Sequence, residues 1–204
     1  MCGRYYIEIS DQALKQIADE VMRRMNQQPA YGQLQIKFDG EIFPSNVVPV
    51  QTAEADYQPM RWGFNSFRAA NRKQPPLIIN ARSETVLEKQ TFRRAVLENR
   101  CLVPASGYYE WMRLDDSSTK SKYRLFSDRT LYFAGCYRNE TVPGSKQVAT
   151  PSFVILTQAA SPDILTIHDR MPVIFDQSSA MQWLEQGTLS LDSALHQLKY
   201  ELVE

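Results

Sequence analysis

The chain has 204 residues, and its 23 basic and 23 acidic side chains give a formal net charge of zero at neutral pH. This length suits one compact domain with a sizeable core, or at most two small domains. Because the charges balance, the composition excludes a protein that binds a polyanion through its overall charge, and any such partner must be held by a local patch.

The three cysteines, Cys2, Cys101 and Cys136, are an odd number without zinc-type spacing. This pattern favours a reducing compartment over a disulfide framework and gives no reason to expect a structural metal. The start of the chain is polar, and no apolar run approaches the ~18 residues of a membrane span. We therefore expect a cytoplasmic protein with no secretory signal, no membrane partner and no metal.

The chain begins Met1-Cys2-Gly3-Arg4. Initiator methionine is normally removed when a small residue such as cysteine follows, and Cys2 would then carry a free α-amine beside its thiol. An α-amine titrates near ~8 and lysine near ~10.4, so the terminal amine is the better nucleophile at neutral pH and needs no cofactor. The alternative is that Cys2 is an incidental buried thiol behind an untrimmed Met1.

The first half of the chain mixes strands and helices. A strand is predicted over residues 4–9, and a helix with Ser10 as its N-cap over residues 11–25, where apolar residues recur at helical spacing. Asp39-Gly40 predicts a tight turn in a hairpin between residues 34–38 and 41–43. A second helix is expected over residues 85–99, because Thr85 and Glu88 form a capping-box pattern and Leu87, Phe92, Val96 and Leu97 would face the core.

The second half carries short apolar runs that are typical of strands, at residues 101–103, 123–126, 131–137 and 152–157. Asp128-Arg129 predicts a turn between two of them, and the polar residues 139–151 predict a surface loop. Closing helices are expected over residues 178–186 and 190–198, with Gly187 as the helix stop. The predicted class is α+β, an antiparallel β core flanked by helices.

A basic and aromatic segment lies between Asp56 and Glu84, which have no acidic residue between them. It contains Arg61, Arg68, Arg72, Lys73 and Arg82, interleaved with Trp62, Phe64 and Phe67. Such a mixture suits single-stranded nucleic acid, with cations on phosphates and rings against unpaired bases. A solvated basic loop over an aromatic core is the equally open alternative.

Three further stretches carry polar side chains that chemistry can use. Asn80 and Arg82 follow the apolar residues 77–79, where a strand ends and loops often carry function, although a turn residue and a surface ion pair would explain them too. Glu110 is flanked by Tyr109 and Trp111, and burial among rings would raise its pKa, whereas strand alternation also allows it to face solvent. His168 lies in a dense polar cluster and can transfer protons near neutral pH, or serve only structure, as we expect of His196.

Taken together, these stretches resemble the SOS response-associated peptidase family, whose bacterial and eukaryotic members protect abasic sites in single-stranded DNA. The matching motifs occur in the family's order and span about 170 residues. They are Cys2-Gly3-Arg4, Asn46-Val47-Val48-Pro49, Trp62-Gly63, Asn80-Ala81-Arg82-Ser83-Glu84, Pro104 through Trp111, Ala134-Gly135, and His168-Asp169-Arg170-Met171-Pro172.

The resemblance implies a reaction at the mature N-terminus. An abasic deoxyribose opens to an aldehyde, and the terminal aminothiol of Cys2 condenses with it to a thiazolidine crosslink that shields the lesion. Asn80 would position the amine or sugar, Glu110 would shuttle protons, and His168 would assist opening of the sugar ring. Self-processing would remove Met1, and lyase activity and reversal of the crosslink belong to the same expectation.

The resemblance also implies how DNA is held. Arg4 and Arg82 would hold phosphates around the lesion, and the remaining expected contacts are Trp62, Phe67, Arg68 and Arg72. We expect one domain over residues 1–204 with a barrel-like β core, acting without cofactor or metal as a monomer on single-stranded DNA containing abasic sites. In a bacterium or phage host it would be nucleoid-associated.

The chain departs from the family pattern in places, and two other classes stay open. Val48 replaces the usual alanine, Asn65-Ser66-Phe67 replaces a proline and tryptophans, and the usual C-terminal Val-Asn segment is absent. Glutamine amidotransferases, which are N-terminal-nucleophile hydrolases, also begin Met-Cys-Gly but usually continue with an apolar residue in place of Arg4. The second alternative is a noncovalent single-strand binding module in which Cys2 is idle.

Overall fold

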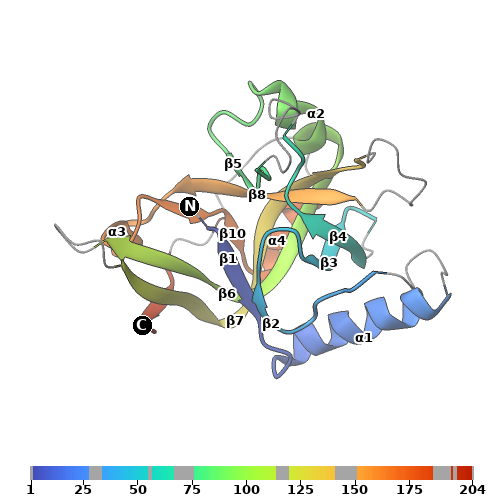
Figure 1. Ribbon diagram of the computed structural model, residues 1–204, viewed down its shortest axis with the longest axis horizontal. Coiled ribbons are helices and arrows are strands. Elements are labelled where there is room, and N and C mark those ends of the chain that lie inside the picture. Colours follow the sequence, from blue (N-terminus) through green and yellow to red (C-terminus); the bar gives the residue numbers. More distant parts are fainter. Residues whose placement is uncertain are drawn as a thin grey trace.

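The computed structural model describes residues 2–27, 34–54, 57–66, 76–113, 120–140, 151–185, 194 and 197–203. Within these ranges, eleven strands form one sheet and four helices lie outside it (Figure 1). Among these described residues, no helix is long and apolar enough to cross a membrane.

Five strands close into a barrel, in the order β7-β8-β4-β3-β6 and back to β7. They are β3 (Val47–Thr52), β4 (Tyr57–Trp62), β6 (Arg100–Arg113), β7 (Lys120–Arg138) and β8 (Ser152–Ala159). All neighbours in this ring are antiparallel except β4 and β8, which pair in parallel. The barrel predicted from sequence is therefore confirmed, with one parallel pair that the alternation pattern did not indicate.

The N-terminal strand β1 (Arg4–Ile7) pairs with β6 on one side and with β2 (Gly40–Ile42) on the other. The predicted hairpin between residues 34–38 and 41–43 is therefore wrong. Gly40 does adopt the positive φ of +79° that the Asp-Gly pair predicted, but β2 pairs with the free edge of β1. Ile36 instead bridges Val47 at the start of β3.

Helix α1 (Gln12–Gln27) packs against β3 and β4 through a buried apolar stripe that includes Leu14 and Val21 (Figure 1). Its cap is Asp11 and not the predicted Ser10. Oδ1 of Asp11 accepts from the backbone N–H groups of Ala13 and Leu14, at 2.8 and 3.4 Å. A carboxylate fits this position because it meets the positive end of the helix dipole.

Helix α2 (Gln90–Glu98) begins five residues later than the capping-box pattern at Thr85 predicted. The N–H groups of Glu88 and Lys89 both donate to the Thr85 carbonyl, so this stretch closes turns before the helix starts. Val96 is buried and Phe92 packs on the core, as expected. Leu87 and Leu97 are 40% and 50% exposed, so their predicted place in the core is wrong.

Strands β6 and β7 form the longest ladder of the sheet. Asp128-Arg129 is not a turn between separate strands, because β7 continues through both residues. Ala105 and Gly107 of β6 pair with Leu131 and Phe126 of β7, so β7 has more residues than β6 between these two pairs, and the pairing register shifts there. Gly107 is required there, since a Cβ would collide with the Leu125 carbonyl oxygen and the Tyr6 ring.

Short elements flank the far end of β8 on both edges. β5 (Asn80–Arg82) runs parallel to it, and β9 (Arg170–Pro172) pairs antiparallel to it. Helix α3 (Pro162–Leu165) connects β8 to β9, and β10 (Ile174–Phe175) then joins the edge of β7. The topology thus brings the segments that contain Asn80 and His168 to neighbouring positions.

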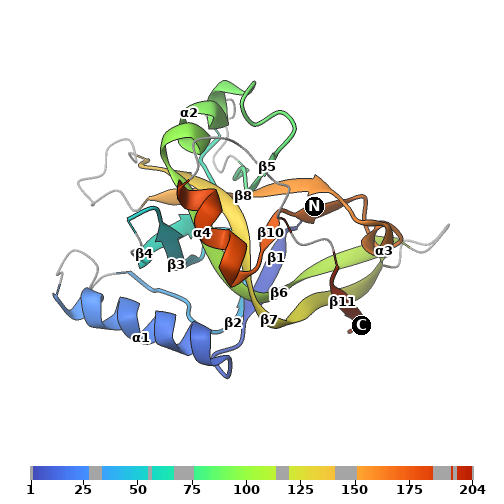
Figure 2. The same cartoon turned by 180° about the vertical axis from the view of Figure 1, so that it is seen from behind.

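Helix α4 (Gln177–Glu185) covers the outer face of the barrel beside β6 and β7, as Figure 2 shows. It confirms the first of the two predicted closing helices. The second, over residues 190–198, lies mostly outside the described residues, and Gly187 lies outside them entirely. Strand β11 (Lys199–Leu202), which pairs with β7, was not predicted.

Candidate functional site

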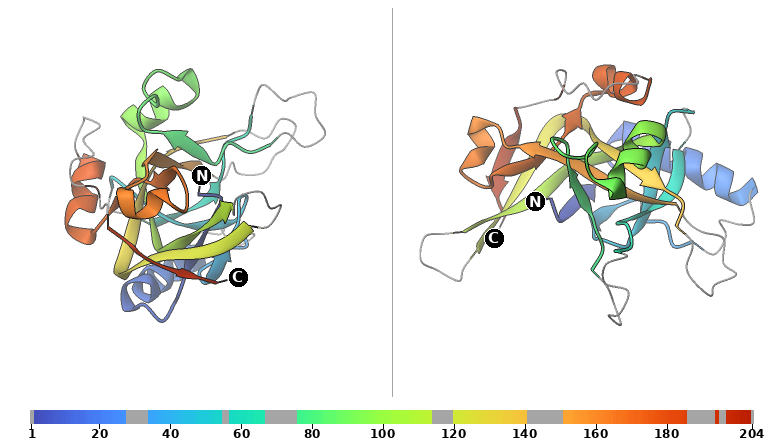
Figure 3. Two further views of the ribbon diagram at one scale, coloured as in Figure 1. Left: turned by 90° about the vertical axis from the view of Figure 1, so that its left-hand side faces the viewer. Right: turned by 90° about the horizontal axis from the view of Figure 1, so that it is seen from above.

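Cys2 lies two residues before the start of β1 and is fully buried. In the view of Figure 1 the N-terminus lies between β5 and α3, and Figure 3 shows it from two further sides. The thiol contacts the Arg4 carbonyl oxygen as a weak donor at 3.8 Å. Burial raises the thiol pKa well above its ordinary value, and the nearby Glu110 carboxylate raises it further, so the sulfur stays protonated at neutral pH.

Asn80 is the first residue of β5, and its side chain contacts the backbone of Cys2. Its Nδ2 donates to the Cys2 backbone oxygen at 2.7 Å, although 78 positions separate the two residues. Its Oδ1 is buried and accepts no hydrogen bond from the described residues. The amide therefore holds the Cys2 backbone and presents an acceptor beside it.

Glu110 lies on β6 and is only 3% exposed, so its side chain does not face solvent. Burial raises the pKa of its carboxyl, and smaller electrostatic interactions with the amino terminus and with His168 oppose that rise. The Glu110 carboxylate in turn adds to the rise that burial causes in the pKa of the Cys2 thiol. A buried carboxyl with a raised pKa next to a nucleophile is suited to transferring protons near neutral pH.

His168 lies in the segment between α3 and β9. Its Nδ1 accepts from the Arg170 backbone N–H at 3.0 Å and also lies 2.8 Å from Oδ1 of Asp169. The two contacts belong to different protonation states: the neutral ring accepts from Arg170, whereas a protonated Nδ1 donates to Asp169. His168 and Glu110 line the same pocket, which has a volume of about 540 Å³ and also includes Trp111.

Arg4 and Arg82, the expected phosphate ligands, differ in how they are held. The Arg4 guanidinium lies 4.3 Å from the ring centre of Phe43 and 3.4 Å from a carboxylate oxygen of Glu41. Lys122 shares that carboxylate, since its Nζ lies 2.6 Å from the other oxygen. Arg82 is exposed at the end of β5, and its backbone oxygen accepts from the Thr85 N–H at 3.2 Å. The pKa of the nearby Glu84 carboxyl is lowered mainly by hydrogen bonding from Arg170, with a smaller contribution from the Arg82 charge.

Trp62 is part of the barrel interior. Its ring is fully buried against Tyr5 and Phe153, and its Nε1 donates to the Ile79 carbonyl oxygen at 3.0 Å. This burial does not fit the expected contact between Trp62 and DNA, because no part of the ring is available to stack on a base. The other expected contacts in this segment, Phe67, Arg68 and Arg72, lie outside the described residues.

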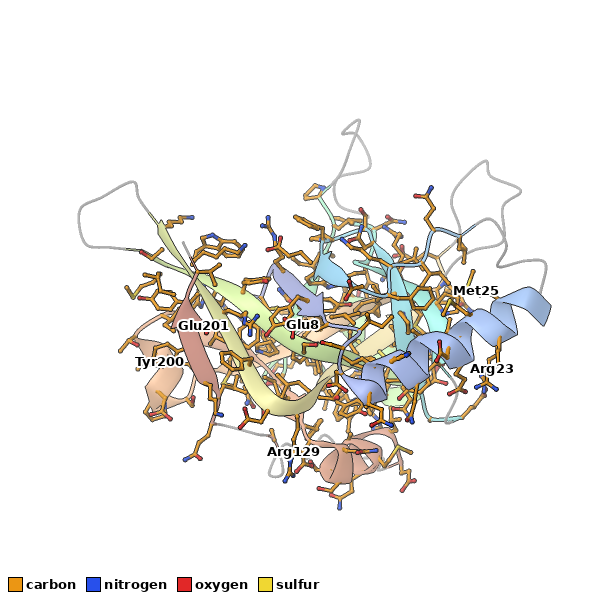
Figure 4. The ribbon with its side chains drawn as sticks, turned by 90° about the horizontal axis from the view of Figure 1, so that it is seen from below. Glu8, Arg23, Met25, Arg129, Tyr200 and Glu201 are labelled. Carbon is orange, nitrogen blue, oxygen red and sulfur yellow. The ribbon has the colours of Figure 1, made fainter. Side chains whose placement is uncertain are left out.

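A larger hollow of about 980 Å³ lies at the other end of β1, away from this cluster. Two of its lining residues, Glu8 and Arg129, lie on the face seen from below in Figure 4. None of the candidate residues lines it, so we place the candidate site at the smaller pocket, where the perturbed groups are. Across the described ranges, no cluster of three or more histidine, cysteine or acidic side chains is arranged to hold a metal ion.

The structure adds residues that sequence reasoning missed. Tyr5 and Tyr108 are cross-strand neighbours on β1 and β6, and their buried hydroxyls have no hydrogen-bond partner among the described residues. Burial raises the pKa of both, with a smaller contribution from Cys2. Glu84 forms an ion pair with Arg170, 86 positions away. Both residues were in recognised motifs, but a single sequence carries no signal that pairs them.

Comparisons with known proteins identify the family to which the chain is similar. The model of the family described as "SOS response associated peptidase (SRAP)" matches residues 1–203. The abasic site processing proteins YoaM and YoqW of Bacillus subtilis are 32% and 31% identical to the chain, over 94% and 90% of its length and 82% and 80% of their own. HMCES of Mus musculus, another abasic site processing protein, is 29% identical over 67% of this chain and 47% of its own.

A solved structure of a protein from Bacteroides thetaiotaomicron has the same fold, with a TM-score of 0.76 at 22% identity, over 100% of this chain and 92% of that one. A second, from Bordetella bronchiseptica, has a TM-score of 0.69 at 21% identity and covers both chains completely. At these identities the two structures establish the barrel architecture alone.

Proposed function

The chain belongs to the SOS response associated peptidase family, and on this premise we propose that it processes abasic sites in single-stranded DNA by covalent capture on Cys2. The observation that carries the proposal is the buried arrangement around Cys2. Asn80 binds the Cys2 backbone at 2.7 Å, and Glu110 is electrostatically coupled to the Cys2 thiol and to His168.

The first step is the exposure of the reactive group. Hydrolysis of the Met1–Cys2 peptide bond consumes one water and leaves an α-amine and a thiol on the same residue. Both groups are needed, because the product is a ring that contains the nitrogen and the sulfur of one cysteine. The family description includes the word peptidase, which supports this processing step.

The amine attacks first. The thiol is protonated because burial and Glu110 raise its pKa, and a thiol is a much weaker nucleophile than a thiolate. The neutral amine adds to the aldehyde carbon C1′ of the opened sugar, and loss of one water gives an imine. The sulfur then adds to C1′ while the thiol proton moves to the nitrogen, which closes a five-membered thiazolidine.

Each buried polar residue has a role in this sequence. Glu110 gives a proton to the departing water and regains one from the nitrogen as the imine forms. When the sulfur attacks, Glu110 relays the thiol proton to the nitrogen, since its raised pKa suits these transfers. His168 lines the same pocket and transfers the proton of the C1′ hydroxyl to the ring oxygen O4′ as the C1′–O4′ bond breaks, which opens the furanose to the aldehyde. Asn80 orients the Cys2 backbone, and its buried Oδ1 accepts a hydrogen bond from the amine or the sugar.

DNA is held by cations near the site. Arg82 offers an exposed guanidinium at the end of β5, where a phosphate next to the lesion can bind it. Arg4 lies over Phe43 and near Trp111, at 4.3 and 5.1 Å from the ring centres, so a phosphate and a base can meet the cation and the rings together. We propose the basic segment that contains Phe67, Arg68 and Arg72 as a further contact.

The test uses oligonucleotides with one abasic site and asks which atoms of Cys2 are needed. The wild-type protein is expected to give a product that survives denaturing gel electrophoresis. Cys2→Ser keeps the amine and loses the sulfur, so its product should appear only after the imine is reduced with borohydride. A chain that keeps Met1 should give neither product.

The outcomes separate the alternatives. If Cys2→Ser and wild type give equal amounts of a stable product without borohydride, ring closure by sulfur is wrong. If neither protein gives a product but both bind the oligonucleotide, the chain is a noncovalent binding module. Release of ammonia from glutamine by the wild type, lost in Cys2→Ser, would instead favour the amidotransferase-like hydrolase.

A further inference from the structure

Arg170 is the first residue of β9, two positions after His168, and its side chain is only 11% exposed. Its Nη1 and Nη2 donate to Oε1 and Oε2 of Glu84, at 2.6 and 2.9 Å. Nη2 also donates to the backbone oxygen of Thr157, at 2.7 Å. Only a guanidinium can make all three contacts, because its planar fork carries several fixed donors.

Thr157 is the residue at which β5, which contains Asn80, and β9, which follows His168, both pair with β8. On β8 it pairs with Arg82 of β5 across one edge and with Pro172 of β9 across the other. Its carbonyl oxygen accepts from the Ser83 N–H at 2.9 Å as well as from Arg170. The Arg170 side chain therefore crosses β8 and joins the end of β5 to the start of β9.

Each end of this connection lies close to a residue of the candidate site. On the β9 side, the backbone N–H of Arg170 donates to Nδ1 of His168 at 3.0 Å, which leaves Nε2 of the neutral ring to carry the proton. On the β5 side, Asn80 begins the strand that ends just before Ser83 and donates to the Cys2 carbonyl.

We propose that Glu84 and Arg170 form a clamp across β8 that holds Asn80 and His168 at the spacing needed to act on one sugar. This inference rests on the covalent capture proposed above and adds two positioning residues to it. Neither residue touches the reacting atoms. The clamp acts through backbone placement, and a displacement of about 1 Å at a reacting group can slow a reaction by up to about 100-fold.

The competing interpretation is that Glu84 and Arg170 form an ordinary surface ion pair. A measurement of protein stability would hardly distinguish this interpretation from the clamp. The Glu84 side chain is 50% exposed, so its loss should change the free energy of unfolding only slightly. The same exposure makes Glu84→Gln a useful variant, because the protein should fold. The decisive quantity is therefore the rate of the chemical step.

The experiment measures two quantities for wild type, Glu84→Gln and Arg170→Lys. One is the single-turnover rate of adduct formation at saturating abasic-site oligonucleotide, and the other is the dissociation constant for an oligonucleotide with an unreactive tetrahydrofuran site. The matched control is Glu98→Gln, which breaks the exposed Arg94–Glu98 pair on α2. We expect both clamp variants to react about tenfold more slowly without weaker binding, and the control to react as wild type. Wild-type rates in Glu84→Gln would overturn the clamp.

A second readout needs no reaction with DNA. The chain has two histidines, so ¹⁵N signals of the His168 ring can be assigned with His196→Gln as reference. In wild type the neutral ring should show the tautomer with the proton on Nε2, and Glu84→Gln should shift the signals toward a mixture. If the wild type forms no adduct, the proposed function fails, and an unchanged tautomer in Glu84→Gln then refutes the clamp separately.

Discussion

Glu41 forms ion pairs with two cations beside the candidate site, Arg4 and Lys122. Its two carboxylate oxygens lie 3.4 Å from the Arg4 guanidinium and 2.6 Å from the Lys122 ammonium. A phosphate that binds Arg4 must therefore approach a carboxylate of the same sign or displace it. The prediction is that Glu41→Gln binds single-stranded DNA more tightly than wild type.

The size of the effect follows from the geometry. A phosphate on Arg4 would lie several ångströms from the Glu41 carboxylate, which is 27% exposed, so solvent screens most of the repulsion. A repulsion of about 1 kcal/mol results, which corresponds to roughly fivefold in the dissociation constant. If one more phosphate contact forms on the single strand, the plot of log K against log salt becomes steeper by about 0.7.

Fluorescence anisotropy with an oligonucleotide carrying the unreactive abasic analogue, measured over a range of salt concentrations, gives both numbers. Glu98→Gln is the matched control, because it removes the same charge from a pair on α2, away from the site. Unchanged or weaker binding by Glu41→Gln, with an unchanged slope, would mean that Arg4 does not meet a phosphate.

Three further predictions concern single side chains. Glu110→Gln should slow adduct formation by about 100-fold. It should also raise the melting temperature at neutral pH: burial raises the folded-state pKa of this acid, so the wild type loses stability as the pH rises above the unfolded-state value near 4.5, and glutamine carries no such charge. Arg82→Ala should weaken DNA binding and flatten the salt dependence by about 0.7, because an exposed cation that can bind a phosphate is lost. Asp11→Ala should lower the free energy of unfolding by about 1 kcal/mol in a denaturant titration, whereas Ser10→Ala should change it much less, since Asp11 is the cap of α1.

The fold was predictable where local pattern decides it. The apolar runs that became β8 and the end of β7, and the start of α4, follow from periodicity and end signals alone. The predictions are wrong where the pairing of a segment depends on a partner that is distant in sequence. Residues 41–42 pair with β1 and not with residues 34–38, because β1 offers a free edge that no local pattern reveals.

Caps and turns show the same division. Ser10 and Asp11 are both good N-caps by residue type, and the choice between them depends on the chain's exit from β1. Asp128-Arg129 has the composition of a turn, but the register shift opposite Gly107 lets β7 continue through it. The assignment of one domain to residues 1–204 stays a prediction.

The candidate site was predictable to the extent that its residues lie in recognisable motifs. The sequence pointed to Cys2, Asn80, Glu110 and His168, and the structure brings them together around one buried thiol and one pocket. Their catalytic roles stay proposals. Trp62 shows the limit of composition, since an aromatic residue beside cations was read as a base contact but fills the barrel.

The central claim is that both the nitrogen and the sulfur of Cys2 bond to the aldehyde carbon of an abasic site. The most direct test is peptide mass spectrometry of the product from an abasic-site oligonucleotide. The account predicts an N-terminal peptide that begins at Cys2, without Met1, carries the sugar remnant with loss of one water, and no longer reacts with a thiol-alkylating reagent at Cys2. A remnant on a lysine, or a Cys2 thiol that still alkylates in the product, would contradict it.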